Sequence, residues 1–196
     1  MTDPLLETGD GNTPLDEDEA DGLRLTWVRT RGDLNEAERA NIVAARRALR
    51  SVTLDDVLDD LWLRELHRRM FGTVWSWAGR YRTTEKTIGI DPAGIAGAVR
   101  SLTADCRWWI EDDDGDGTLA RFHHRLVAVH PFANGNGRHA RAATDHLADA
   151  LGAARPTWGM NAGLDGAELR RRYIRALRSA DGDGDDLDAL ARFLRS

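Results

Sequence analysis

The sequence predicts a mostly α-helical fold, a compact bundle of about seven helices with one small β-hairpin. Three observations support this prediction. Apolar residues recur three and four positions apart over most of the chain after residue 35. Residues 79–91 break that pattern, because they are rich in Thr and Ile and bounded by glycine, which favours a hairpin. Helix-start pairs precede several apolar stretches, at Thr53–Asp56, Asp91–Pro92 and Asp165–Glu168.

The first half of the chain contains three predicted helices and the hairpin. Residues 35–50 are good helix formers with one apolar stripe. Residues 54–70 follow the cap at Thr53, and Gly72 supplies the stop. A third helix, residues 92–109, begins at the Asp–Pro pair and continues one apolar face beyond the hairpin.

The second half contains four more predicted helices. Residues 119–129 carry an apolar stripe that ends at a His–Pro pair. Residues 137–151 form the next helix, with Gly152 as its cap. The Asp–Glu cap starts a helix over residues 165–177, and a short leucine stripe over residues 187–194 forms the last.

Composition limits the classes of protein that the chain can belong to. It has 196 residues, of which 41% are hydrophobic and 31% charged, as in an ordinary globular protein. We expect a single domain over residues 23–196, preceded by an acidic arm over residues 1–22. The net charge of −6 argues against general nucleic-acid binding. One cysteine, no basic leader and no apolar run of ~20 residues predict a cytoplasmic protein that does not enter a membrane.

One stretch, "HPFANGNGRHAR" at residues 130–141, has the composition of an anion-binding loop. Gly135 and Gly137 allow a ligand to approach the main chain closely. The N–H groups at the start of the following helix lack partners and carry the positive end of the helix dipole. A glycine loop that leads into a helix N-terminus therefore predicts an anion site.

The cations of this stretch indicate which anion would bind. Arg138 lies in the first turn of the helix, and Arg141, three residues later, projects from the same side. Their forked guanidinium groups suit phosphate oxygens. Asn136 can add a side-chain donor. The arrangement best fits a di- or triphosphate.

His130 stands at the other edge of the loop. An unperturbed histidine has a pKa of ~6.5, so it can accept a proton at neutral pH. Beside a bound phosphate it could deprotonate a hydroxyl that then attacks phosphorus. A glycine loop or a lone histidine at a helix end is ordinary in structural roles. Their combination with two spaced arginines within twelve residues favours a catalytic site, with Phe132 as an anchor in the core.

These residues resemble the signature of the Fic (filamentation induced by cAMP) family, His-x-Phe-x-Asp/Glu-Gly-Asn-Gly-Arg-x-x-Arg. The resemblance extends over roughly residues 54–194, because "GRYRT…IGIDP" is similar to the flap of the family and "YIRALRSADGDGDDLDALARFL" to its closing helices. The N-terminal "DGNTPLDEDEADGL" resembles a bacterial subgroup called mobile mystery protein B. The signature is matched at His130, Phe132, Gly135, Asn136, Gly137, Arg138 and Arg141.

The resemblance implies a protein nucleotidyltransferase, which uses ATP and Mg²⁺ or Mn²⁺ to transfer AMP to a Ser, Thr or Tyr hydroxyl of a target protein. His130 would be the general base. The phosphates would be held by Gly135, Asn136, Gly137, Arg138 and Arg141. The flap, residues 79–91, would pair with an extended segment of the target by strand addition. The flap residues in that role would be Lys86, Thr87, Ile88, Gly89 and Ile90.

Asn134 is the one departure from the signature. The family has an acid there that holds Mg²⁺, whereas asparagine keeps the oxygen and loses the charge. Three alternatives follow: weaker metal use, a different nucleotide or transferred group, or nucleotide or partner binding without transfer. We rank weaker metal use first, because every other catalytic position matches. Gly137 disfavours the related Doc kinases, which carry lysine at that position.

Many members of the family are inhibited by a helix with the pattern Ser/Thr-x-x-x-Glu-Gly/Asn, whose glutamate blocks an arginine. Residues 13–18 and 179–184 have similar spacing but lack the final Glu-Gly or Glu-Asn pair. The sequence therefore predicts no internal inhibitor, and a separate inhibitory partner stays open.

Overall fold

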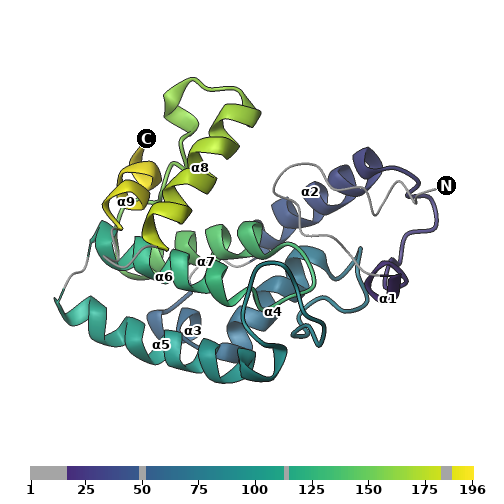
Figure 1. The fold of residues 1–196 in the computed structure, drawn as a ribbon, viewed down its shortest axis with the longest axis horizontal. Coiled ribbons are helices and arrows are strands. Elements are labelled where there is room, and N and C mark those ends of the chain that lie inside the picture. Colours follow the sequence, from purple (N-terminus) through teal and green to yellow (C-terminus); the bar gives the residue numbers. More distant parts are fainter. Residues whose placement is uncertain (1–16, 49–51, 113–114, 182–186) are drawn as a thin grey trace.

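The computed structural model describes residues 17–48, 52–112, 115–181 and 187–196, and it is built almost wholly from helices (Figure 1). The predicted mostly α-helical fold is confirmed. In chain order the elements are α1 (Glu17–Ala20), α2 (Arg31–Ala48), α3 (Leu54–Val57), α4 (Asp60–Phe71), the 3₁₀ turn η1 (Pro92–Gly94), α5 (Ile95–Asp112), α6 (Asp116–Val129), α7 (Asn136–Ala150), the 3₁₀ turn η2 (Met160–Ala162), α8 (Gly166–Ala180) and α9 (Asp188–Arg195).

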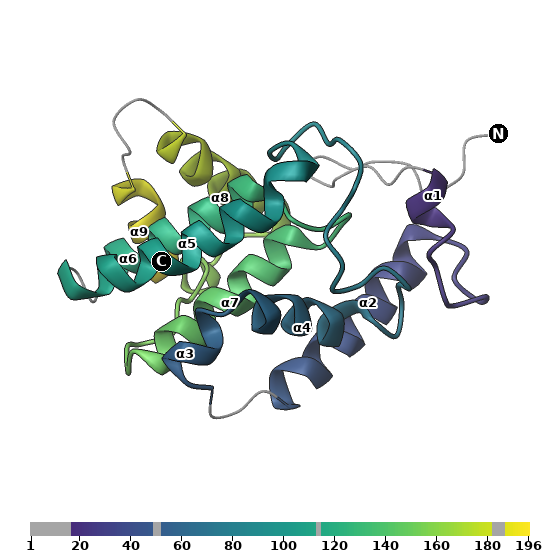
Figure 2. The ribbon, with the colours of Figure 1, turned by 90° about the horizontal axis from the view of Figure 1, so that it is seen from below.

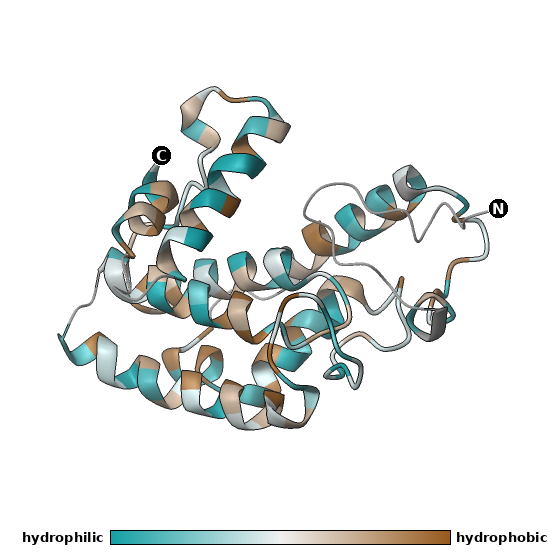
Figure 3. Cartoon of the chain, viewed as in Figure 1, coloured by the Kyte–Doolittle hydropathy of each residue, from teal (hydrophilic) through white to brown (hydrophobic). Residues whose placement is uncertain are grey.

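Helix α7 lies at the centre of the bundle. It packs against α3, α4 and α6, and α6 in turn packs against α5 and α9 (Figures 1 and 2). Small side chains let these neighbours approach α7 closely, since Ala140, Ala143 and Ala148 are wholly buried. Helix α2 packs on α4 at the N-terminal side, whereas α8 packs on α9 and turns a hydrophilic outer face to solvent (Figure 3).

The predicted helix caps form as local hydrogen bonds. The Thr53 hydroxyl accepts from Asp56 N at 3.2 Å, while Thr53 N donates to the Asp56 carboxylate at 2.9 Å. The carboxylate of Asp91 accepts from the second residue of η1 at 2.8 Å. The carboxylate of Asp165 accepts from Glu168 N at 2.8 Å. These bonds satisfy N–H groups that the first helical turn leaves without a partner.

Two helices differ from the prediction. Helix α2 begins at Arg31, because Thr30 and Asp33 form a reciprocal cap that the sequence analysis missed. The single helix predicted over residues 54–70 is wrong. It divides into α3 and α4, because Asp59 is extended, with φ −119° and ψ 133°. The break allows α3 and α4 to take different directions while their apolar residues stay in one core.

The predicted hairpin over residues 79–91 is also wrong. None of these thirteen residues belongs to a strand, and the one isolated β-bridge among the described residues joins Leu23 to Trp75. The guanidinium of Arg82 explains the difference. It donates to the carbonyls of Thr84 at 2.8 Å and Ile90 at 2.6 Å. The Arg82 side chain therefore joins the two sides of the segment, and it occupies carbonyls that a strand pair would use for inter-strand hydrogen bonds. We keep the name flap for residues 79–91.

The predicted acidic arm over residues 1–22 lies outside the described residues as far as residue 16. From Glu17 the chain forms α1, and Glu19 of this helix is only 8% exposed. Its carboxylate accepts from the Thr84 hydroxyl at 2.9 Å and forms an ion pair with Lys86. Helix α1 is therefore attached to the flap.

Candidate active site

The loop from His130 to Gly135 connects α6 to α7 and reverses the chain at both ends. His130 ends α6 in the left-handed region, with φ 51°. Gly135 precedes α7, also in the left-handed region, with φ 78°. A Cβ at Gly135 would lie 2.6 Å from the ring of Phe71. Glycine is thus required there by the backbone conformation and by the packing of α4 on the loop.

The loop is anchored in the core through Phe132, as the sequence predicts. Phe132 is fully buried and stacks on the ring of His67, with the ring centroids 3.7 Å apart. Nε2 of His67 donates to the carbonyl of Asn134 at 3.0 Å, because its Nδ1 already accepts from Gly79 N at 3.0 Å. Sequence reasoning missed His67. Its place on the buried face of α4, beside Leu66, was the available signal.

The side chain of Asn136 closes the loop instead of facing a ligand. Its Oδ1 accepts from Phe132 N at 2.9 Å, and its Nδ2 donates to Phe132 O at 2.7 Å. Asn136 is also only 3% exposed. The expected side-chain donor is therefore engaged within the protein, and Asn136 can serve an anion through its main-chain N–H at the start of α7.

His130 is buried and neutral at physiological pH. It is 6% exposed, and burial together with the neighbouring Arg82 charge lowers the pKa of the imidazole to about 4. The flap lies directly against it, because a Cβ at Gly89 would be 2.8 Å from the Cβ of His130. The structure thus brings the predicted base and the flap together.

Arg82 holds the flap to the loop, and sequence reasoning missed it. Its Nε donates to the carbonyl of His130 at 2.7 Å, and its main-chain N donates to Pro131 O at 3.0 Å. Within the flap, the ion pair with Glu19 buries the Lys86 side chain to 6% exposure, whereas Ile88 is 56% exposed. Of the flap residues expected to contact a target, Ile88 thus presents the exposed large apolar side chain.

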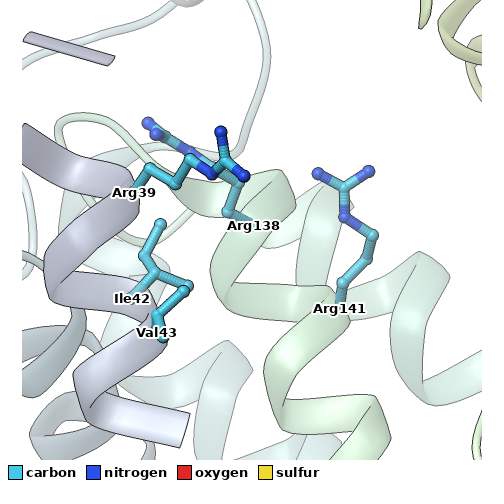
Figure 4. Close-up of a pocket in the computed structure, with 5 residues that line it drawn as sticks. All are labelled: Arg39, Ile42, Val43, Arg138 and Arg141. Carbon is cyan, nitrogen blue, oxygen red and sulfur yellow. The ribbon is translucent and has the colours of Figure 1, made fainter. Parts of the chain in front are cut away.

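Arg138 and Arg141 project from α7, and the structure adds an unexpected partner for the first. Nη1 of Arg138 donates to the carboxylate of Glu38 on α2 at 2.5 Å. The side chain of Glu38 is 3% exposed, and its other oxygen accepts from Trp75 Nε1 at 2.7 Å. Arg141 lies over the ring of Tyr173 at 5.4 Å. The two arginines line one pocket with residues of α2 (Figure 4).

Glu38 therefore forms an ion pair with Arg138, an arginine that we expected from the sequence to bind phosphates. The inhibitory pattern Ser/Thr-x-x-x-Glu-Gly/Asn does not match at Glu38, because Arg39 follows it in place of Gly or Asn. The two stretches with similar spacing, residues 13–18 and 179–184, extend outside the described residues. A different signal was available. Glu38 lies on the stripe of α2 that also carries the buried Leu34 and Ala45, so a carboxylate at that position needed a partner.

Gly137 differs from Gly135 in its surroundings. A Cβ there would meet the Tyr173 hydroxyl at 3.8 Å, an ordinary contact distance, and no positive φ is involved. Packing within the protein therefore does not require glycine at this position. A glycine that packing does not require is consistent with a ligand that approaches the main chain at the first turn of α7.

Asn134 turns its amide oxygen inward. Its Oδ1 accepts from Gly135 N at 2.6 Å. Among the described residues, no three His, Cys, Asp or Glu side chains gather as a metal-binding cluster. An engaged neutral oxygen is a poor ligand for Mg²⁺, which prefers carboxylates and phosphate oxygens. The residues of this site do not form a metal centre on their own.

The buried histidines predict an acid-sensitive fold. Burial lowers the pKa of His139 to about 4 and that of His123 to about 3. The unfolded chain binds protons on these residues below about 6.5, and the folded chain does not. We expect the free energy of unfolding to fall as pH drops from 6.5 to 5, by up to about 1.4 kcal/mol per pH unit for each histidine.

Urea unfolding at pH 7, 6 and 5 measures this effect. Carboxyl groups are ionised in both the folded and the unfolded state over most of that range, so they contribute little to the change of unfolding free energy with pH. The variant His124→Gln is a control, since His124 lies on the same helix as His123 and bonds to the exposed Asp181. A free energy of unfolding that does not change with pH would contradict the prediction.

The family model and the curated relatives that match this chain both carry the name Fic. The family model described as Fic/DOC family matches residues 57–148. The chain is 35% identical over 96 residues to a protein adenylyltransferase fic-1 from Caenorhabditis briggsae, a match that covers 46% of this chain and 18% of the relative. The chain spans about a fifth of the length of the curated relatives it matches.

Solved structures share the fold. The BepC protein of Bartonella tribocorum, described with bound AMPPNP, has a TM-score of 0.67 at 18% identity, over 91% of this chain and 96% of that one. A Fic domain from Bartonella quintana, described with bound ADP, has a TM-score of 0.67 at 15% identity, over 90% and 93%. No helix in the described part of the chain has both the length and the apolar character needed to span a bilayer.

Proposed function

The chain carries a Fic/DOC family domain over residues 57–148, and on this premise we propose that it transfers the AMP part of ATP to a Ser, Thr or Tyr hydroxyl of a target protein. The observation that carries the proposal is the placement of His130. This neutral histidine lies against the flap at one end of a short loop, and the other end starts α7 with Arg138 and Arg141.

The proposed reaction uses these groups in a defined order. The first N–H groups of α7, with Arg138 and Arg141, hold the phosphates of ATP. The flap holds the target segment, so that its hydroxyl meets the α-phosphorus. His130 accepts the hydroxyl proton as the oxygen attacks. The bond from the α-phosphorus to its bridging oxygen breaks, and pyrophosphate leaves with the electron pair of that bond.

His130 suits this task because it is neutral. With a pKa lowered to about 4, the imidazole has a lone pair to accept a proton at any pH above about 5. A low pKa also makes it a modest base, so we propose that positioning of the hydroxyl by the flap supplies much of the rate.

We propose that Mg²⁺ enters with the nucleotide, bound by its phosphates, because the residues of the site do not form a metal centre. Bound Mg²⁺ would offset part of the phosphate charge. Incubation with labelled ATP and Mg²⁺ or Mn²⁺, followed by a search for labelled protein including the chain itself, tests the proposal. Absence of label from a lysate and from the chain, under both metals, would contradict it.

A second function has one supporting observation. Asn134 is neutral and engaged by Gly135 N, so the chain could bind nucleotide or a partner without transfer, or transfer a different phosphate-containing group. ATP binding by calorimetry without label transfer supports binding alone. Label transfer from another nucleotide in the same assay supports a different transferred group.

The effect of Asn134 on metal use is testable by one isosteric change. The carboxylate introduced by Asn134→Asp would keep the bond from Gly135 N through one oxygen and offer the other to Mg²⁺. We expect the Mg²⁺ concentration for half-maximal label transfer to fall by roughly tenfold or more. The wild type is expected to gain more from Mn²⁺ than the variant.

Metal titrations of label transfer compare the two proteins. Asn161→Asp is the matched control, because it makes the same amide-to-acid change at an exposed residue of η2. Coinciding titration curves for wild type and Asn134→Asp would remove Asn134 from the metal-binding region.

A further inference from the structure

A pocket between α2 and α7 lies beside the proposed phosphate site. It has a volume of about 270 Å³. Two of its lining residues, Arg138 and Arg141, come from α7, and the other three come from α2. Those three are Arg39, Ile42 and Val43.

The charge of this lining is concentrated at one end. Figure 4 shows the side chains of Arg39 and Arg138 extending toward each other from α2 and α7, with Arg141 one turn further along α7. Ile42 and Val43 form the apolar side of the pocket. The lining holds three cations and no anion, and Glu38 pairs with Arg138 beside it. The excess of positive charge favours a ligand with several negative charges, which would compete with the Glu38 carboxylate for Arg138.

The size of the pocket limits which part of a ligand it can take. Pockets for whole drug-sized ligands occupy ~300–1,000 Å³, so this one suits a fragment of a nucleotide. Its lining contains no acidic, amide or aromatic side chain that could recognise a base. Three forked cations match the oxygens of a phosphate chain.

Arg39 differs from the two arginines of α7 in its position. Arg138 and Arg141 lie on the helix whose N-terminus faces the loop with His130, so they reach the phosphates near the reacting centre. Arg39 stands on the opposite wall, on an exposed position of α2. A phosphate chain held at α7 would meet Arg39 only if it were long enough to cross the pocket.

We propose that Arg39 is a specificity-determining residue that makes this site select a triphosphate chain over a diphosphate. The proposal rests on the proposed function for the identity of the ligand, and on the pocket geometry for the role of Arg39. Arg39 contacts the terminal phosphate, which carries the charge that a diphosphate lacks at that place. It takes no part in the proton transfer at His130.

The test uses inorganic tripolyphosphate and pyrophosphate as probes, so that it does not depend on a base or on transfer. Calorimetry measures both affinities for the full chain and for Arg39→Ala, Arg39→Lys and Arg192→Ala. Arg192 is the matched control, because it is an exposed arginine of α9, away from α2 (Figure 1).

We expect the wild type to bind tripolyphosphate about tenfold more tightly than pyrophosphate, as the loss of a hydrogen-bonded charged contact implies. Arg39→Ala is expected to remove this preference, Arg39→Lys to restore part of it, and Arg192→Ala to leave it intact. Equal preference in wild type and Arg39→Ala, or no binding of either probe, overturns the proposal. Selection of tripolyphosphate without any label transfer from ATP would instead support Arg39 and contradict the proposed function.

Discussion

Replacement of His130 by alanine is expected to abolish label transfer while ATP binding stays within about twofold of wild type. In the proposed function, ATP binding rests on the start of α7 and its arginines, whereas the chemistry requires an acceptor for the hydroxyl proton. Removal of a general base commonly lowers the rate by about 10²–10⁴-fold. Label transfer from ATP and calorimetry with ATP measure the two effects separately.

The left-handed backbone at His130 requires a second variant. Alanine is less suited than asparagine to the φ of 51° at this position. His130→Asn keeps a residue that tolerates this conformation and removes the basic nitrogen. Both variants are expected to lose transfer. His124→Ala on the same helix is the control and should keep it. Wild-type labelling by a folded His130→Asn protein would rule out His130 as the base.

Glu38→Gln is expected to strengthen ATP binding by about tenfold or more and to raise label transfer. In the proposed function, the phosphates compete for Arg138 with the Glu38 carboxylate, which contacts Arg138 at 2.5 Å in the structure. Hydrogen bonds between charged groups contribute about 1.5–3 kcal/mol. Each 1.4 kcal/mol corresponds to about tenfold in affinity. Glutamine removes the charge and keeps an oxygen for Trp75 Nε1, so the fold is retained.

A matched control separates this local effect from a change in net charge. Glu36→Gln makes the same neutralisation on the same helix at an exposed position, and it is expected to leave ATP affinity unchanged. Calorimetry with ATP on wild type and both variants decides the matter. Equal affinity of Glu38→Gln and wild type would mean that the Glu38–Arg138 pair does not restrain the site. In that case, inhibition of the site would require a separate partner.

The loop residues illustrate what could be predicted from sequence. Gly135 and Phe132 have the backbone and anchoring roles expected of them, because these follow from local conformation and from the apolar character of one side chain. The roles of His130, Arg138 and Arg141 in catalysis and binding stay predictions. The structure corrects the expectation for Asn136, whose side chain bonds to the main chain of Phe132.

The sequence by itself determined the helices and their caps, since a cap such as Thr53–Asp56 joins residues three positions apart and an apolar stripe repeats within one helix. Only the tertiary structure decided that Arg82 bonds the flap to His130, that Glu38 pairs with Arg138, and that α2 faces α7 across a pocket. These contacts join residues 48 and 100 positions apart. Their formation depends on how whole helices pack, because burial of the apolar stripes brings the helices together and so decides which polar side chains meet.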